Sequence, residues 1–342
     1  MSLTSHLKTP HSPVRQFLDA HFPNARAIVA GCREKLVGAT TLRPAAPVAW
    51  STVGTALDYR ARYYFGVTPP EEFVAWKGAW QCAHGVVARS ARGVARGLVF
   101  DATTGEVTAR WVSAEGEPLP ELDERSRAEF EEMKRFFTAL SRAVEEIDPV
   151  GRRLDGLQEA HLNRYCYVLA LFEELFRAGT QIDSPLFALP KRGVDELLAV
   201  PPAHAIDDLC TLSWAFYTRF EGLLSRPAVL NPTFDGSLDV GGADADLILD
   251  GCLIDIKATV KPRVDPLWLY QLLGYVLLDY TDRYRISEVA IYLARQQVTL
   301  RWPLDGFLAS MAGGDVPALG EVRARFQGVA STASALMLAQ RQ

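Results

Sequence analysis

Helical periodicity dominates the chain before residue 227. Apolar residues recur at three- and four-residue spacing in six segments, which are 13–21, 24–35, 51–65, 121–147, 155–178 and 205–225. Residues at this spacing share one face of a helix, and such a face packs against a core. The segment 155–178 is apolar on most of its faces, so we expect it to be a central helix.

The pattern changes after Pro227. Residues 239–259 and 286–302 are strand-like, whereas residues 266–280 return to helical spacing. The end of the chain is rich in small apolar residues and predicts a peripheral helix. We therefore expect an α/β fold with a small mixed sheet, flanked by helices and preceded by a helical subdomain.

These elements predict four regions along the chain. They are an N-terminal region at 1–117, a helical subdomain at 118–226, a sheet-containing core at 227–305 and a C-terminal helical tail at 306–342. Within the first region, residues 98–101 and 106–112 flank Thr103-Thr104-Gly105 and predict a hairpin.

The segment 239–259 contains the strongest turn signal. Asp250-Gly251 favours a two-residue hairpin turn, because both central positions of that turn need positive φ. The turn fixes a register whose predicted pairs are Leu249 with Cys252, Ile248 with Leu253, Leu247 with Ile254, Asp246 with Asp255 and Asp244 with Lys257. Because side chains alternate between the two faces of a strand, the three aspartates and the lysine share one face. The opposite face is entirely apolar.

The predicted pair of Asp246 and Asp255 is a candidate metal site. Opposed carboxylates have Cβ atoms about 4.5–5.5 Å apart and repel each other unless a positive group lies between them. Mg²⁺ prefers carboxylate oxygen, and a metal held in this way polarises a phosphate and lowers the pKa of bound water. Lys257 is suited to orient or deprotonate that water, and the Ile256 carbonyl is a further metal contact. The alternative interpretation is a solvated polar face with one cross-strand ion pair.

These residues resemble the PD-(D/E)XK nuclease superfamily, and within it the RecB-like group that includes lambda-type exonucleases. In that group an Asp on one strand and a D/E-x-K on the next bind the metal, and a following helix carries Gln-x-x-x-Tyr, matched here by Gln271-Leu-Leu-Gly-Tyr275. The resemblance implies a restriction-endonuclease-like core at 227–305 with the helical subdomain as an insertion. It implies a Mg²⁺-dependent nuclease, with Mn²⁺ as an alternative metal, whose catalytic residues are Asp246, Asp255, Lys257 and Gln271, with Tyr275 as a further candidate.

Three more residues are candidates through the same resemblance. The upstream Gly-x-x-x-His of the family is matched by Gly54-Thr-Ala-Leu-Asp58, so Asp58 takes the place of the metal-binding His. The family pattern Gly-x-x-Asp fits Gly241–Asp244, while the strand pattern favours Asp246, so Asp244 is a second candidate. Some members add an acidic residue from a helix before the hairpin, and Glu221 is suitably placed; an ordinary surface glutamate is the alternative.

Composition limits the partners and cofactors. The net charge is −5 and the pI about 5.8, so a nucleic-acid contact must be a local basic strip in an acidic protein. The five cysteines contain no C-x-x-C pair, which argues against a disulfide framework and a structural zinc site. Some members of the group that this chain resembles hold an iron–sulfur cluster with one early cysteine and three that follow the Gln helix. No cysteine follows Cys252 here, so the resemblance implies no such cluster. Neither a signal peptide nor a membrane span is visible, and the expected location is the cytoplasm.

We therefore expect a nuclease whose partner is nucleic acid, with DNA as the expected substrate, in genome defence or repair by family resemblance alone. The alternative is a non-catalytic nucleic-acid-binding or scaffold subunit that retains the nuclease fold. Trp268 and Tyr270 are suited to stack on bases, although we expect at least one of them in the core. Basic residues that could line a groove are Lys261, Arg263, Arg283, Arg285, Arg295 and Arg301.

Overall fold

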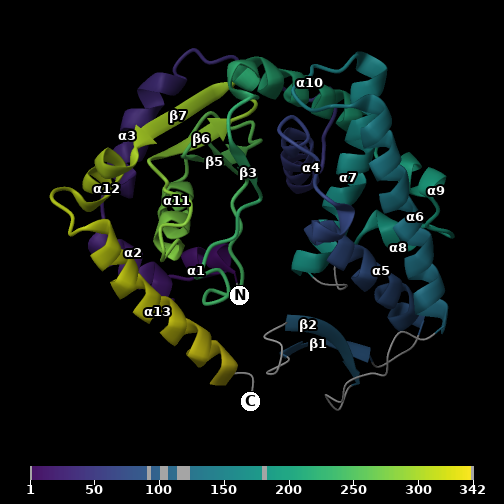
Figure 1. Cartoon of the computed structure of the whole chain (residues 1–342), viewed down its shortest axis with the longest axis horizontal. Helices are drawn as coiled ribbons and strands as arrows, with labels where there is room; N and C mark the ends of the chain where they lie inside the picture. Colours follow the sequence, from purple (N-terminus) through teal and green to yellow (C-terminus); the bar gives the residue numbers. More distant parts are fainter. Residues whose placement is uncertain (1, 91–93, 101–106, 114–123, 179–182, 340–342) are drawn as a thin grey trace. The chain divides into compact units, whose positions relative to one another are not determined.

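The computed structural model describes residues 2–90, 94–100, 107–113, 124–178 and 183–339. The chain divides into two compact units (Figure 1). Met1–Arg43 and Ala215–Gln342 together form the first, which we call the sheet unit; Pro44–Trp214 forms the second, the helical unit. The helical unit extends further toward the N-terminus than the predicted subdomain at 118–226, and the first 43 residues join the sheet.

The sheet unit is built on a five-stranded sheet in the order β3-β4-β5-β6-β7. The strands are β3 (Ala228–Leu230), β4 (Leu247–Leu249), β5 (Cys252–Lys257), β6 (Glu288–Leu293) and β7 (Val298–Pro303). Neighbouring strands are antiparallel except β5 and β6, which run parallel and are joined by helix α11 (Pro266–Leu278). A parallel pair needs such a crossover connection. The predicted α/β class and the mixed sheet flanked by helices are therefore confirmed.

The β4–β5 hairpin forms at the predicted turn. Asp250 and Gly251 have φ angles of 51° and 77°, as a two-residue turn with positive φ at both positions requires. The three predicted pairs nearest the turn, from Leu249–Cys252 to Leu247–Ile254, are all present. The ladder ends there, so the predicted register is wrong for its last two pairs, Asp246 with Asp255 and Asp244 with Lys257.

Both faces of the sheet are covered. On one face, Ile248 and Leu253 lie in the same buried core as Leu273 of α11. On the other face, Tyr292 of β6 contacts Phe216 and Phe220 of α10 (Ala203–Phe220). Because side chains alternate along β5, Asp255 stands on the face that α11 covers. The face of the sheet that α11 covers is mostly apolar. The polar side chains that β5 places on it, Asp255 and Lys257, lie at the end of the strand.

Helices from both ends of the chain complete the core around α11. They are α1 (Leu3–Lys8), α2 (Pro13–His21), α3 (Ala25–Leu36), α12 (Leu304–Ala312) and α13 (Leu319–Ala339) (Figure 1). Leu3 is buried against Gly274, where an added Cβ would come within 2.9–3.0 Å of the leucine methyl groups. Glycine at this position thus lets α1 approach α11 closely. From α13, Arg323 donates to the Val276 carbonyl at 3.1 Å.

The helical unit contains α4 (Trp50–Arg62), α5 (Val74–Ser90), α6 (Glu124–Ile147), α7 (Gly156–Ala178), α8 (Pro185–Ala188), α9 (Val194–Ala199) and most of α10. Arg60 of α4 and Glu159 of α7 form a fully buried ion pair at 2.7 Å. Strands β1 (Val94–Phe100) and β2 (Val107–Ser113) pair antiparallel, as the predicted hairpin requires, while its turn lies outside the described residues. In the described parts of the chain, no helix is long and apolar enough to cross a membrane.

Candidate active site

Away from the turn, strands β4 and β5 stop pairing after Leu247 and Ile254. The backbone before Leu247 pairs instead with the segment that follows β3: Asn231 N donates to the Asp246 carbonyl at 3.2 Å, and Ala245 N donates to the Pro232 carbonyl at 3.1 Å. Strand β5 continues to Lys257 in register with β6. The sheet therefore opens between β4 and β5, next to the residues of the predicted site.

The Asp246 side chain crosses this opening. Its Oδ2 accepts a hydrogen bond from the Ile256 N–H at 2.6 Å. In an unbroken antiparallel ladder that N–H would donate to a backbone carbonyl of β4, so the carboxylate takes the place of a lost ladder bond. The bond holds Asp246 beside the β5 backbone, next to the residue whose carbonyl is a predicted metal contact.

Asp255 is a buried carboxylate with a lysine beside it. Only 2% of its surface is exposed, and its Oδ2 lies 2.7 Å from Lys257 Nζ. Burial raises the pKa of the Asp255 carboxyl, and the neighbouring Lys257 charge acts in the opposite direction. A buried carboxylate needs a positive partner to remain ionised. Lys257, two residues further along the same strand face, supplies that partner.

Helix α11 adds the two polar side chains that its motif predicts. Lys257 Nζ donates to Gln271 Oε1 at 3.1 Å, and Gln271 Nε2 donates to the Tyr275 hydroxyl at 2.7 Å. Burial raises the pKa of Tyr275, and the charges of Asp255, Asp246 and Asp244 raise it further. The hydroxyl therefore stays protonated while three carboxylates act on it. Hydrogen bonds and an ion pair thus bring together Asp246, Asp255, Lys257, Gln271 and Tyr275 around the end of β5. Asp244 joins them only through the effect of its charge on the pKa of Tyr275.

The donor chemistry of this cluster fits Mg²⁺. In the described parts of the chain, no group of three or more His, Cys, Asp or Glu side chains could hold a metal ion. Mg²⁺ does not need such a cage, because one or two carboxylates, waters and substrate phosphate oxygens are its usual ligands in phosphoryl-transfer sites. Asp246, Asp255 and the Ile256 carbonyl would provide hard oxygen atoms on the protein side. Asp255 in particular is a buried acid for which a cation offsets the effect of burial.

Two of the predicted site residues, Asp58 and Glu221, belong to other elements. Asp58 belongs to the helical unit, where its carboxylate pairs with Arg62 one helical turn away. Glu221 is exposed in the short 3-10 helix η2 (Glu221–Leu223). Among the described residues, no hydrogen bond or ion pair joins the Glu221 carboxylate to the cluster around Lys257. Metal binding by either residue stays a prediction.

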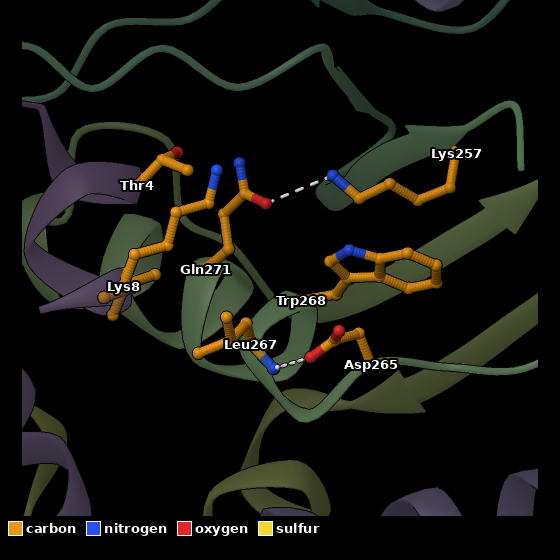
Figure 2. A pocket seen from close by; sticks show the side chains of 8 residues that line it. Thr4, Lys8, Lys257, Asp265, Leu267, Trp268 and Gln271 are labelled. Atoms are coloured by element: carbon orange, nitrogen blue, oxygen red, sulfur yellow. Dashed lines mark hydrogen bonds between the residues drawn. The ribbon is translucent and has the colours of Figure 1, made fainter. Parts of the chain in front are cut away.

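A cavity of about 260 Å³ lies beside the cluster (Figure 2). It is lined by Thr4, Leu7, Lys8, Lys257, Asp265, Leu267, Trp268 and Gln271. Figure 2 shows Lys257 reaching in from the strand above the Trp268 ring, with Lys8 and Thr4 on the opposite side, from α1. Thr4 and Lys8 were not candidates from the sequence, because no local motif marks them. Only the packing of α1 on α11 brings them to the site.

The two aromatic candidates have different environments. Tyr270 is buried, and its hydroxyl donates to the Phe22 carbonyl at 3.1 Å, so the expectation that one of the pair belongs to the core is confirmed. Trp268 is partly exposed and lines the cavity. Among the predicted basic residues, Arg295 is fully buried and donates to the Ala258 and Leu42 carbonyls. It therefore holds the backbone together and does not line a groove.

No family model matches the chain, and neither the curated proteins nor the solved structures contain a match. The function must therefore be inferred from the geometry and chemistry of the cluster around Asp255, Lys257 and Gln271.

Proposed function

We propose that this protein is a Mg²⁺-dependent nuclease that hydrolyses phosphodiester bonds, with DNA as its substrate. The observation that carries the proposal is the position of Lys257 Nζ, 2.7 Å from Asp255 Oδ2 and 3.1 Å from Gln271 Oε1. An amine held beside a buried carboxylate, with a second, half-buried carboxylate bonded to the backbone of the residue between them, is the combination that metal-assisted phosphodiester hydrolysis needs. A structural ion pair alone does not require the second carboxylate or the glutamine.

Each side chain has a distinct role in this proposal. When bound, Mg²⁺ supplies positive charge at the phosphate and a water of lowered pKa. Asp246 and Asp255 would hold the ion. Lys257 donates a hydrogen bond to the attacking water or to a phosphate oxygen, and its charge offsets the negative charge that builds up there. Gln271 is a positioning residue, since it fixes the Lys257 amine and is itself fixed by Tyr275.

The same proposal includes a restriction-endonuclease-like core. Its support is the mixed sheet with an antiparallel β4–β5 hairpin, a parallel β5–β6 pair and α11 as the crossover helix. The acidic residues lie where β4 and β5 part, and Gln271 and Tyr275 approach them from α11. On this proposal the helical unit is an insertion between Arg43 and Ala215.

A cleavage panel tests the proposal. Wild type, Lys257→Ala and the control Lys35→Ala would be incubated with linear and circular DNA, single- and double-stranded, in Mg²⁺, Mn²⁺ or EDTA. Lys35 is an exposed lysine of α3 in the same unit. We expect metal-dependent cleavage by wild type and Lys35→Ala, and none by Lys257→Ala. Cleavage of nothing by wild type, or equal cleavage by all three proteins, contradicts the proposal.

The second candidate is a nucleic-acid-binding subunit that retains the fold without catalysis. It is favoured by one observation, that no three acidic, His or Cys side chains among the described residues form a metal group. Calorimetric titration with Mg²⁺ separates the two candidates. Binding in wild type that is lost in Asp246→Asn supports the nuclease, and no binding at millimolar Mg²⁺ supports the second candidate.

A further inference from the structure

The cavity beside Lys257 is small, and its lining holds two lysines and one acidic side chain. Lys8 and Lys257 supply two amines, Thr4 a hydroxyl and Gln271 an amide, while Trp268 forms an apolar wall. Asp265 is the single acidic side chain of the lining, and its Oδ1 accepts from the Leu267 N–H at the start of α11 at 2.9 Å. Its charge is thus partly balanced by the helix N-terminus. The remaining lining favours an anion attached to a flat apolar group.

Trp268 has the position of a stacking platform. Lys257 Nζ lies 5.7 Å from the centre of its ring, so one face of the indole is already turned toward a cation. The ring is partly exposed although it stands on a helix whose other large side chains are mostly buried. Partly exposed aromatic rings beside basic side chains are the usual platform for nucleobases in single-strand binding proteins, since every base has a π-face.

We infer that this cavity binds one unpaired nucleotide next to the phosphate that is cleaved. Its base stacks on Trp268, and its outer phosphate contacts Lys8 and Thr4 of α1. The inner phosphate then lies at Lys257, which belongs both to the cavity and to the proposed catalytic cluster. This inference rests on the proposed nuclease function and assigns that site a substrate class, a single-stranded nucleic acid or an unpaired strand end.

The size of the cavity favours an unpaired base over a base pair. At about 260 Å³ it is smaller than the pockets that hold drug-sized ligands, which span about 300–1,000 Å³. A space of this size suits a single nucleotide better than a base pair. A base inside a duplex would first have to leave its stack, which costs a few kcal/mol in general and least for bases already unpaired.

Binding without turnover tests the inference. The probe is thymidine 3′,5′-bisphosphate, titrated into the full chain in EDTA and followed by calorimetry. The variants are Trp268→Ala, Trp268→Phe and Lys8→Gln, with Lys35→Gln as the matched lysine control. Circular dichroism establishes that each variant is folded. We expect Trp268→Ala and Lys8→Gln each to weaken binding roughly tenfold, Trp268→Phe to weaken it less, and Lys35→Gln to leave it unchanged.

Two further ligands identify what is recognised. Inorganic phosphate should bind more weakly than the bisphosphate and should not respond to Trp268→Ala, because it offers no ring to stack. A single-stranded oligonucleotide should displace the bisphosphate, whereas a relaxed, closed circular duplex, which has no loop and no end, should not. Equal affinity of the bisphosphate for all variants, or equal competition by the circular duplex, overturns the inference.

The design separates this inference from the proposed function. Because the titration contains no metal and no reaction, a chain that binds the bisphosphate as expected but cuts nothing refutes the nuclease alone. A chain that cuts DNA with Mg²⁺ but binds the bisphosphate equally in Trp268→Ala, Lys8→Gln and wild type refutes the nucleotide cavity alone.

Discussion

Asp255 is the residue at which burial and charge oppose each other most strongly. Its carboxylate is almost fully removed from solvent, yet the proposed reaction needs it ionised. Lys257 offsets part of the effect of burial without reversing it, because the pKa of Asp255 remains raised. A carboxyl group with a pKa raised in this way is typical of functional sites. A divalent cation bound beside it would lower the pKa again.

The raised pKa predicts how stability changes with pH. For a group whose pKa is higher in the folded state, the stabilising contribution is present below its unfolded pKa and is lost as pH rises through the folded pKa. Asp255→Asn removes this titration. In EDTA, we expect its melting temperature to exceed that of wild type by a margin that grows from about pH 4 toward neutrality. Added Mg²⁺ should stabilise wild type and not the variant. A margin that stays constant with pH contradicts the raised pKa.

Asp246 combines a structural and a proposed metal-binding role, and two substitutions separate them. Asp246→Asn retains an oxygen that accepts from the Ile256 N–H, so we expect stability within about 1 kcal/mol of wild type. Asp246→Ala leaves that N–H without its acceptor and should cost about 1–3 kcal/mol. Urea unfolding measures both values, and calorimetry should show that both variants lose Mg²⁺ binding. Retained Mg²⁺ binding in Asp246→Asn would show that the assigned ligand is wrong.

At the level of secondary structure, the hairpin was predictable and the opening beside it was not. Asp250-Gly251 fixes the turn, and the local alternation of side chains fixes three paired positions. The two strands separate there because the backbone of Ala245 and Asp246 forms hydrogen bonds with Pro232 and Asn231. The local sequence does not indicate which of two possible partner segments the backbone will pair with. The Gln271 and Tyr275 pair was predictable because four-residue spacing on a helix aligns side chains.

Gly78 sets the distance between α5 and α7 in the helical unit. A Cβ built on Gly78 would overlap the backbone carbonyl of Phe172, and a backbone atom cannot move aside as a side chain does. We expect Gly78→Ala to destabilise the helical unit by about 3 kcal/mol through overpacking. Gly31→Ala in α3, where nothing lies within 4 Å, should stabilise by about 0.5–1 kcal/mol. Chemical unfolding followed by circular dichroism measures both, and equal effects would contradict the packing argument.

At the scale of the whole molecule, the charge distribution limits how nucleic acid is bound. The net charge of −5 repels a polyanion at long range, so binding must depend on a few local contacts. The structure places two of them, Lys8 and Lys257, in one cavity. Sequence reasoning found Lys257 through its motif but not Lys8, because the contribution of the first helix depends on its packing against α11, far along the chain.

This distribution predicts a shallow salt dependence. With two lysine–phosphate contacts, the logarithm of the association constant for single-stranded DNA should fall with a slope of about −1.4 against the logarithm of salt concentration. Lys8→Gln should reduce the slope by about 0.7, and Lys35→Gln should leave it unchanged. Fluorescence anisotropy in EDTA across a salt series gives these slopes. A steep slope, unaffected by Lys8→Gln, would indicate a broad basic surface elsewhere on the chain.

The most direct measurement is the rate of phosphodiester cleavage as a function of Mg²⁺ concentration, in wild type, Asp246→Asn, Asp255→Asn and Lys257→Ala. The wild-type rate on single-stranded DNA should rise to saturation with Mg²⁺ and vanish in EDTA. Each variant should lose about a hundredfold or more at saturating Mg²⁺, while Lys35→Ala cuts at the wild-type rate. A wild-type rate that is zero, that is independent of metal, or that is shared by the three variants would contradict the assignment of this cluster as a nuclease site.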